Sequence, residues 1–281
     1  MSASYILRRR LAGSSKILNK YLQHGWNAKP SPSFTHPPCG RTMSTAYSGS
    51  LLDLSFHDEG MAVVNMKSGQ NTLLPKAMEE WHQALDAVEQ NPDCRALVST
   101  GNEKFFCNGL DLEYVKTFTD HERQLAEYLD ELNRLCIRLL LFPLPTVAAI
   151  SGHAFAGGAV VAFAHDLRVM RRDRGWLCLN EILINFSFPP ILLAMIRAKI
   201  PPGPILTQAV LQAKRYTADE AVKCGIVDQV ADQSQLVNTA VQMANEFLGK
   251  HGIKRKTLHS FKKDLYYPVL QTSNGQVRSR V

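Results

Sequence analysis

The stretch Pro145-Thr-Val-Ala-Ala-Ile-Ser-Gly-His-Ala-Phe-Ala-Gly-Gly158 contains the two patterns that decide the fold. Its first half is a short apolar run, which predicts a buried strand over 145–150. Its second half consists mostly of small residues and leads into a short predicted helix over 159–164. An earlier segment, 101–112, also follows a predicted strand and carries glycines. Such turns leave backbone N–H groups free at a helix start, so both segments can present donors to a ligand.

Strands and helices alternate on both sides of this stretch, whereas the end of the chain reads as helical. Strand patterns and turn residues predict a hairpin and three further strands, over 51–66, 96–100, 167–170 and 176–179. Apolar periodicity predicts helices over about 75–91, 122–142, 191–199 and 204–212, and from about 235 and 254. Capping-box spacing occurs at Thr119-Asp-His-Glu122 and at Thr217-Ala-Asp-Glu220, and Gly225 is placed as a C-cap. The order predicts an α/β core covered by a helical C-terminal portion.

The charge of the chain is concentrated at its N-terminus. The formal net charge is +7, but residues 1–52 carry seven Lys or Arg and no Asp or Glu, so the remainder is neutral. A neutral body gives no electrostatic reason to expect nucleic-acid binding. Residues 1–45 therefore read as a basic targeting segment, disordered or removed, with the composition of a mitochondrial transit peptide. The alternative is a merely disordered tail. No apolar run is long enough to span a membrane.

The cysteines and histidines show no metal-site spacing. The six cysteines are scattered without C-x-x-C pairs, which favours reduced thiols, and no H-E-x-x-H motif is present. We therefore expect no metal. The glycine loops match neither G-x-G-x-x-G nor a P-loop, which disfavours nucleotide phosphate binding of those kinds. His153 and the pair His165-Asp166 lack a G-x-S-x-G elbow, so we interpret them as structural polar groups.

Glu181 lies in the run Leu179-Asn-Glu-Ile-Leu-Ile-Asn-Phe186, with no Lys or Arg beside it. A glutamate in such a run either reaches the surface or is held in an apolar site, where its charged form is disfavoured and its pKa rises. The second possibility makes Glu181 a candidate proton-transfer group.

Three segments together resemble a known family. Phe105-Phe-Cys-Asn-Gly-Leu-Asp-Leu112 resembles the F-S-x-G-x-D-L signature of the crotonase (enoyl-CoA hydratase/isomerase) superfamily, and 145–158 resembles its P-x-I-A-A-I-x-G-x-A-x-G-G-G signature. Asn180-Glu181 and the run 170–175 resemble the enoyl-CoA Δ-isomerase branch. The resemblance covers about residues 50–265.

The resemblance implies a fold, a substrate and a set of site residues. The fold is an α/β spiral of ββα units over about 50–200, with a helical C-terminal trimerisation portion over about 201–270 in one domain of residues 50–270. The partners are an acyl-CoA thioester and further copies of the chain in a homotrimer or hexamer. No cofactor is implied, because coenzyme A is part of the substrate. The oxyanion hole would use the backbone N–H groups of Leu110 and Gly157. Acyl-CoA-binding positions would be Phe106, Asn108, Gly109, Asp111, Leu112 and Gly158.

The resemblance also implies which reaction the site performs. Hydratases of this family use two glutamates, and the first of these positions is Val160 here, while the second is Glu181. One base suffices for a double-bond shift, whereas hydration also needs a positioned water. The similarity therefore implies a Δ3,Δ2-enoyl-CoA isomerase of fatty-acid β-oxidation. Another crotonase reaction, such as hydration, and a catalytically silent acyl-CoA-binding or assembly protein remain alternatives.

The chain departs from the family pattern after the glutamate. Phe186 and Phe188 occupy the place of a glycine-bearing turn and are candidates for the acyl pocket, which they would narrow. Ala156 replaces a family glycine, a change we expect to be minor. Lys262 and Lys263 are candidates for contact with the CoA phosphates, or else a solvated helix face. The C-terminal Ser279-Arg-Val281 loosely resembles a peroxisomal signal, so the predicted location is the mitochondrial matrix with the peroxisome as alternative.

Overall fold

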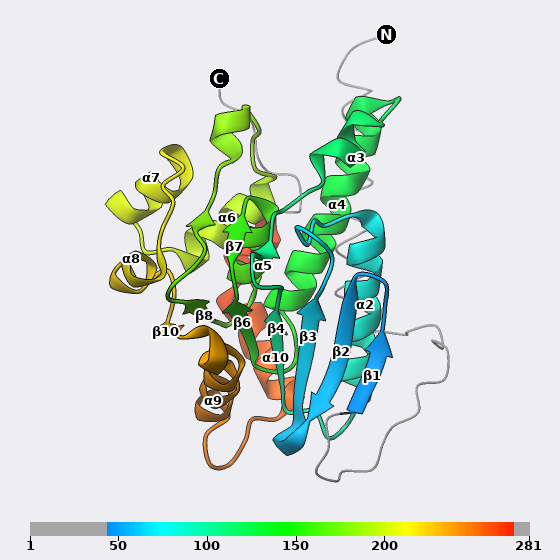
Figure 1. The fold of residues 1–281 in the computed structure, drawn as a ribbon, viewed down its shortest axis with the longest axis vertical. Helices are drawn as coiled ribbons and strands as arrows, with labels where there is room; N and C mark the ends of the chain where they lie inside the picture. The colour runs from blue at the N-terminus through cyan, green and yellow to red at the C-terminus, as the bar shows by residue number, and fades with distance from the viewer. Residues whose placement is uncertain (1–43, 273–281) are drawn as a thin grey trace.

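A computed structural model describes residues 44–272 and shows a large mixed sheet with helices on both faces (Figure 1). Its seven strands lie in the order β1-β2-β3-β4-β6-β8-β10. The first three strands pair antiparallel, and the pairs from β3 onward are parallel. Their bounds are β1 Ser44–Ser48, β2 Leu52–His57, β3 Met61–Met66, β4 Ala96–Thr100, β6 Thr146–Ile150, β8 Leu167–Arg171 and β10 Gln229–Ala231. The α/β class is therefore confirmed.

A second, smaller sheet explains the spiral character of the fold. Strands β5 (Phe105–Cys107), β7 (His153–Phe155) and β9 (Leu177–Cys178) pair in parallel. Each follows a strand of the large sheet, namely β4, β6 and β8. The first two units continue into helices α3 (Leu112–Lys116), α4 (His121–Leu140) and α5 (Gly157–Ala164), and the third continues into the short 3₁₀ helix η2 (Glu181–Ile184). The repeated unit is thus two strands, one in each sheet, followed by a helix.

The remaining helices agree with the apolar periodicity, with one strand added. Their bounds are α2 Pro75–Gln90, α6 Pro190–Lys199, α7 Pro204–Leu211, α8 Ala218–Lys223, α9 Leu236–Leu248, α10 Arg255–Leu265 and α11 Tyr267–Thr272. The prediction that the C-terminal part is helical throughout is wrong at β10, which extends the large sheet beside β8. Three residues are too short a run to show an alternating pattern.

One of the two predicted capping boxes is present. Thr217 and Glu220 exchange the reciprocal bonds at the start of α8, and Gly225 follows that helix with φ +68°. At α4 the prediction is wrong, because Asp120 is the N-cap and its carboxylate accepts the N–H of Arg123. The Gln124 side chain instead accepts the N–H groups of Thr119 and Asp120. Asp is as good an N-cap as Thr, and here it lies one position further on.

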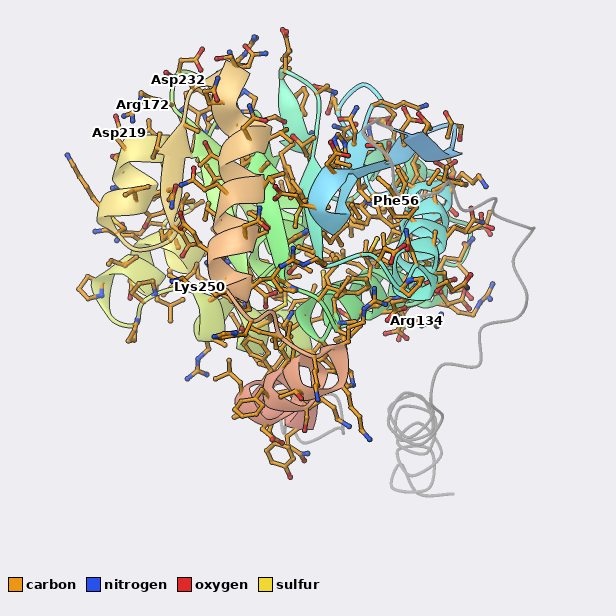
Figure 2. The ribbon with its side chains drawn as sticks, turned by 90° about the horizontal axis from the view of Figure 1, so that it is seen from below. Phe56, Arg134, Arg172, Asp219, Asp232 and Lys250 are labelled. Carbon is orange, nitrogen blue, oxygen red and sulfur yellow. The ribbon has the colours of Figure 1, made fainter. Side chains whose placement is uncertain are left out.

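The large sheet carries an apolar core on each face. One core joins the sheet to α2, α4 and α5, with Trp81, Leu85, Leu135 and Phe163 buried in it. The other joins it to α9, through residues such as Met243. Figure 2 shows α9 lying across the strands, and Arg172 beside Asp219 and Asp232 at one edge. Arg172 pairs with Asp219 at 2.7 Å and so connects the end of β8 to α8. No helix of the described part is long and apolar enough to cross a membrane.

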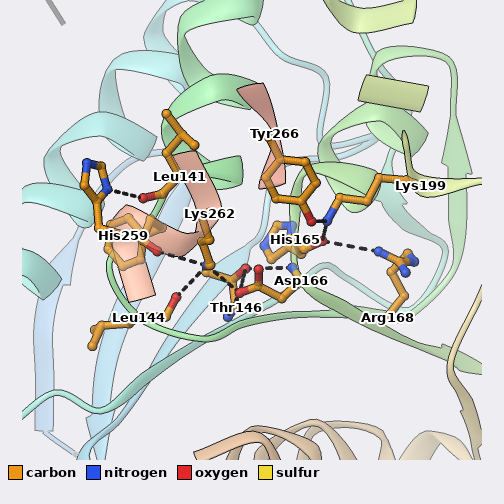
Figure 3. Close-up of polar contacts among 11 residues, drawn as sticks. Leu141, Leu144, Thr146, His165, Asp166, Arg168, Lys199, His259, Lys262 and Tyr266 are labelled. Carbon is orange, nitrogen blue, oxygen red and sulfur yellow. Dashed lines mark hydrogen bonds and ion pairs between the residues drawn. The ribbon is translucent and has the colours of Figure 1, made fainter. Parts of the chain in front are cut away.

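One buried and one half-buried lysine attach the C-terminal helices to the rest of the fold (Figure 3). The Lys262 ammonium on α10 donates to the carbonyls of Phe142 and Leu144 and lies 2.6 Å from Asp166 Oδ2. Lys199 on α6 donates to the Tyr266 hydroxyl and the His165 carbonyl. The prediction that Lys262 contacts CoA phosphates and its alternative, a solvated helix face, are therefore both wrong, because Lys262 is buried and its three donors are used inside the protein. No finding tests the prediction for Lys263.

The turn from β7 into α5 holds its backbone under strain. Ala156 is the N-cap of α5 and has φ +49° and ψ −127°, a region that residues with a Cβ rarely adopt. Two residues later, the Gly158 backbone lies against β5, and a Cβ there would stand 2.1 Å from the Cys107 carbonyl oxygen. The expectation that Ala156 is a minor departure is therefore wrong, since the alanine occupies a conformation suited to glycine.

We expect Ala156→Gly to stabilise the protein by about 1 kcal/mol, because relief of the unfavourable backbone conformation exceeds the entropy that glycine adds to the unfolded chain. Urea denaturation measures the change in the free energy of unfolding. Gly158→Ala is the matched control, expected to destabilise by more than about 3 kcal/mol because its methyl group meets a backbone carbonyl. A destabilised Ala156→Gly protein would show that the turn carries no strain.

Candidate active site

The candidate site lies where the three strands of the small sheet end. Residues 108–110 follow β5, residues 156–157 follow β7, and residues 180–181 follow β9. Because parallel strands bring their carboxyl ends to one edge of a sheet, the three segments predicted from the sequence meet there. Ligands in α/β proteins bind at such an edge.

A cavity of about 680 Å³ opens at this edge. Its size is that of a site for a small organic ligand. The predicted residues that line it are Asn108, Leu110, Asp111, Leu112, Gly157, Val160, Glu181, Phe186 and Phe188. Most of the other walls are apolar, and they come from α4, from α6 and from the segment between β9 and α6.

Two residues that line the cavity, Leu110 and Gly157, have backbone N–H groups without a partner among the described residues. Neither Leu110 nor Gly157 donates its N–H to a backbone or side-chain acceptor in residues 44–272. The two turns are in close contact, since a Cβ built on Gly109 would lie 2.9 Å from the Gly157 nitrogen. Gly109 has φ +81°, which allows its chain to turn at this point. Two free donors on adjacent turns form an arrangement suited to an oxyanion.

A comparison with another buried glutamate, Glu80, shows what is unusual about Glu181. Glu80 on α2 is 1% exposed, and its carboxylate accepts bonds from the backbone of Ser50, Leu51 and Leu52 and from the Ser50 hydroxyl. Burial raises the pKa of Glu80, but these bonds outweigh it and the pKa falls below its ordinary value. Glu181 is 5% exposed, and its Oε2 has no hydrogen-bond partner among the described residues.

Burial accordingly raises the pKa of Glu181 to about 7, and its own backbone N–H offsets this only in part. The carboxyl group is then divided between its charged and neutral forms near neutral pH, as proton transfer requires. Asn180 Oδ1, also at the cavity, is a second buried acceptor without a partner in the described part of the chain. Each of the two acceptors can therefore take a hydrogen bond from a ligand or from water.

Several predicted binding residues have structural contacts within the protein, and their binding roles stay predictions. Phe106, Gly109 and Gly158 do not line the cavity, because Phe106 is buried in the core and both glycines pack against neighbouring backbone. Asp111 lines the cavity, but its carboxylate caps α3 through the Tyr114 N–H and accepts the Thr72 hydroxyl.

Other cavity residues were missed in the sequence. Among them are Ser68, Gln70 and Thr72 before α2, Val115 on α3, Leu125, Leu129 and Leu132 on α4, Ile184 on η2, and Leu192 on α6. The leucines of α4 carry a signal in their i, i+4, i+7 spacing, but core-facing helices have the same spacing. Nothing in the sequence distinguishes a leucine that faces a cavity from one that faces the core.

The histidines that suggested a triad have structural partners. His165 is fully buried, with its ring nitrogens 2.8 Å from the Ser99 hydroxyl and 2.9 Å from the Val161 carbonyl oxygen. Burial lowers the pKa of His165 to about 4, so it is neutral. Its neighbour Asp166 pairs with Lys262 and accepts from Thr146. His153 Nδ1 accepts the Trp176 N–H, so all three residues have structural partners and their interpretation as structural groups is confirmed.

Comparisons with known proteins agree with this geometry. Residues 57–276 match the family model described as enoyl-CoA hydratase/isomerase. Two Arabidopsis thaliana relatives, enoyl-CoA delta isomerase 1, peroxisomal, and enoyl-CoA delta isomerase 2, peroxisomal, are 32% and 35% identical. The matches cover 66% and 64% of this chain and 77% of each relative.

The fold of a solved structure agrees as well. The crystal structure of human mitochondrial delta3-delta2-enoyl-CoA isomerase superposes with a TM-score of 0.72 at 24% identity. The match covers 79% of this chain and 85% of that one. The chain therefore has the crotonase fold and belongs to the enoyl-CoA hydratase/isomerase family, whose members act on acyl-CoA thioesters.

Proposed function

We propose that the protein is a Δ3,Δ2-enoyl-CoA isomerase that converts 3-enoyl-CoA to 2-trans-enoyl-CoA in fatty-acid β-oxidation. The observation that carries the proposal is Glu181, a buried carboxylate whose Oε2 has no partner among the described residues and which lines the same cavity as the two residues with free backbone donors. Family membership supports an acyl-CoA substrate, and the names of the two Arabidopsis relatives support isomerisation.

The mechanism follows from these groups. The thioester oxygen accepts the N–H groups of Leu110 and Gly157, which stabilise the negative charge of an enolate. The Glu181 carboxylate removes a proton from C2, and the electron pair of that C–H bond delocalises over the enolate and the former C3–C4 double bond. Protonated Glu181 then returns the proton to C4, which leaves a C2–C3 double bond. No atom is gained or lost, and one carboxyl group performs both transfers.

Val160 supports isomerisation over hydration. It lines the cavity at the position where the resemblance places the first glutamate of a hydratase. Valine cannot bind or deprotonate a water. The other two carboxylates of the cavity, Asp111 and Glu113, already have partners, so in the described part of the chain Glu181 is the one titratable side chain of the cavity with an oxygen left free.

We expect Glu181→Gln to lower kcat about 10²- to 10⁴-fold, the range for removal of a general acid–base group. The formation of 2-enoyl-CoA from 3-enoyl-CoA is the measurement, with an unchanged thermal midpoint as proof of folding. Glu79→Gln, on the exposed face of α2, is the matched control and keeps the wild-type rate. Full activity of Glu181→Gln would exclude Glu181 as the base.

The same assays test the alternative functions of the wild-type protein. Hydration of 2-enoyl-CoA at a comparable rate would favour the hydratase alternative, and acyl-CoA binding without either activity would favour a silent protein.

The raised pKa predicts the pH dependence of the reaction. Removal of the C2 proton needs the carboxylate, and burial makes this form scarce below pH 7. We expect kcat to rise about tenfold per pH unit below about pH 7 and to level off above it. A 3-enoyl-pantetheine substrate, which lacks the CoA phosphates, is the control for titration of the substrate. A profile flat from pH 5.5 to 8 would contradict a raised pKa.

The location belongs to the same proposal. The composition of residues 1–45 supports the mitochondrial matrix, and the names of the Arabidopsis relatives support the peroxisomal alternative. Residues 1–43 and 273–281 lie outside the described residues. A fluorescent protein fused to residues 1–45 is expected to enter mitochondria. If it stays in the cytosol, the mitochondrial proposal is wrong.

The homotrimer or hexamer also stays a prediction. Phe261, Leu265 and Tyr267 on α10 and α11 are large, exposed and close in sequence. Such residues on the C-terminal helices support association through this part of the chain.

A further inference from the structure

The cavity has two rims of different chemistry. Gln70 and Asn108 form a polar rim, where the Asn108 amide donates to Gln70 Oε1 at 2.6 Å. Leu112 and Ile184 line the same cavity and are 52% and 47% exposed, so they form an apolar rim. Leu110, whose N–H is free, lines the cavity as well and lies between Asn108 and Leu112 in sequence. The cavity that holds the proposed reaction centre therefore has both a polar and an apolar part at its surface.

Helix α4 connects the reaction centre to the apolar part. A Cβ built on Gly157 would lie 3.4 Å from Leu132 Cδ2, so Leu132 packs beside the proposed oxyanion hole. Leu129 and Leu125 line the cavity on the same face of α4, at positions i−3 and i−7. The row from Leu132 to Leu125 spans about 10 Å of helix.

Four further residues that line the cavity are apolar, namely Val160, Phe186, Phe188 and Leu192. The two carboxylates near the apolar rim already have partners, because Asp111 accepts the Tyr114 N–H and Glu113 pairs with Lys116. A hydrocarbon beside Asp111 and Glu113 therefore leaves neither carboxylate without a partner.

We propose that this channel binds the alkyl tail of a long-chain 3-enoyl-CoA, which runs along Leu132, Leu129 and Leu125 and leaves over Leu112 and Ile184. This inference rests on the proposed function and specifies its substrate class. The tail covers apolar side chains that are otherwise exposed to water, a favourable change. Phe186 and Phe188 also line the channel.

Affinity then depends on chain length. Each methylene group that leaves water for the channel is expected to lower KM roughly fourfold until the tail passes the apolar rim. We therefore expect KM to fall steeply from 3-hexenoyl-CoA through 3-decenoyl-CoA to 3-tetradecenoyl-CoA with the wild-type protein.

Leu125→Trp tests the path of the tail. It places a bulky ring about 10 Å from Leu132, so a six-carbon chain stays clear of it and a fourteen-carbon chain does not. KM for 3-tetradecenoyl-CoA is expected to rise at least about tenfold, whereas KM for 3-hexenoyl-CoA stays within about twofold. Ala126→Trp adds the same ring at an exposed residue of α4 outside the cavity and is the matched control. Ile184→Ser, which removes part of the apolar rim, is expected to weaken only the longer substrates.

Two results would overturn the proposal. One is a wild-type KM that does not fall with chain length. The other is a Leu125→Trp protein with an unchanged thermal midpoint whose KM rises equally for all three substrates or for none of them. Failure to convert any 3-enoyl-CoA would instead contradict the isomerase function. In that case, calorimetric binding of saturated hexanoyl-, decanoyl- and tetradecanoyl-CoA to the same variants still decides whether the channel selects chain length.

Discussion

The close contact between the Gly158 backbone and β5 is the constraint on which the site depends. A methyl group at position 158 would overlap the Cys107 carbonyl, so only glycine lets helix α5 begin this near the small sheet. The same approach brings the turn at Gly109 against Gly157, which puts the free N–H groups of Leu110 and Gly157 on adjacent turns. Packing geometry thus prepares an electrostatic site, and no side-chain donor is needed for the proposed oxyanion.

The raised pKa of the Glu181 carboxyl group results from burial without enough hydrogen-bond donors. Glu80 and Glu181 are both buried, but the backbone of 50–52 surrounds the first with donors and nothing in the described chain donates to Oε2 of the second. Their pKa values consequently move in opposite directions. Burial disfavours the charged form of a carboxyl group. At Glu181 this raises the pKa toward neutral pH, which suits the proposed proton transfer.

Strain and buried charge occur where the sequence looks unremarkable. Ala156 holds a glycine-like conformation at the start of α5, directly before the Gly157 donor. Lys262, in a helix rich in lysine, is buried and satisfied by Asp166 and two carbonyls, so α10 is attached to the sheet by a group that resembled a surface charge. Strain and buried ion pairs depend on what surrounds a residue, which its sequence neighbours do not reveal.

The sequence by itself determined the order of most strands and helices, the three segments that meet at the site, and Glu181 as the candidate proton-transfer residue. These depend on local patterns of apolar residues, glycines and charges, which act over a few residues. Only the tertiary structure decided that β5, β7 and β9 form a sheet of their own, that Leu125, Leu129 and Leu132 face a cavity, and that Phe106 and Lys262 do not. Each of these depends on contacts between residues far apart in the chain, and such contacts set which face of a helix is covered and which carboxylate is left without a donor.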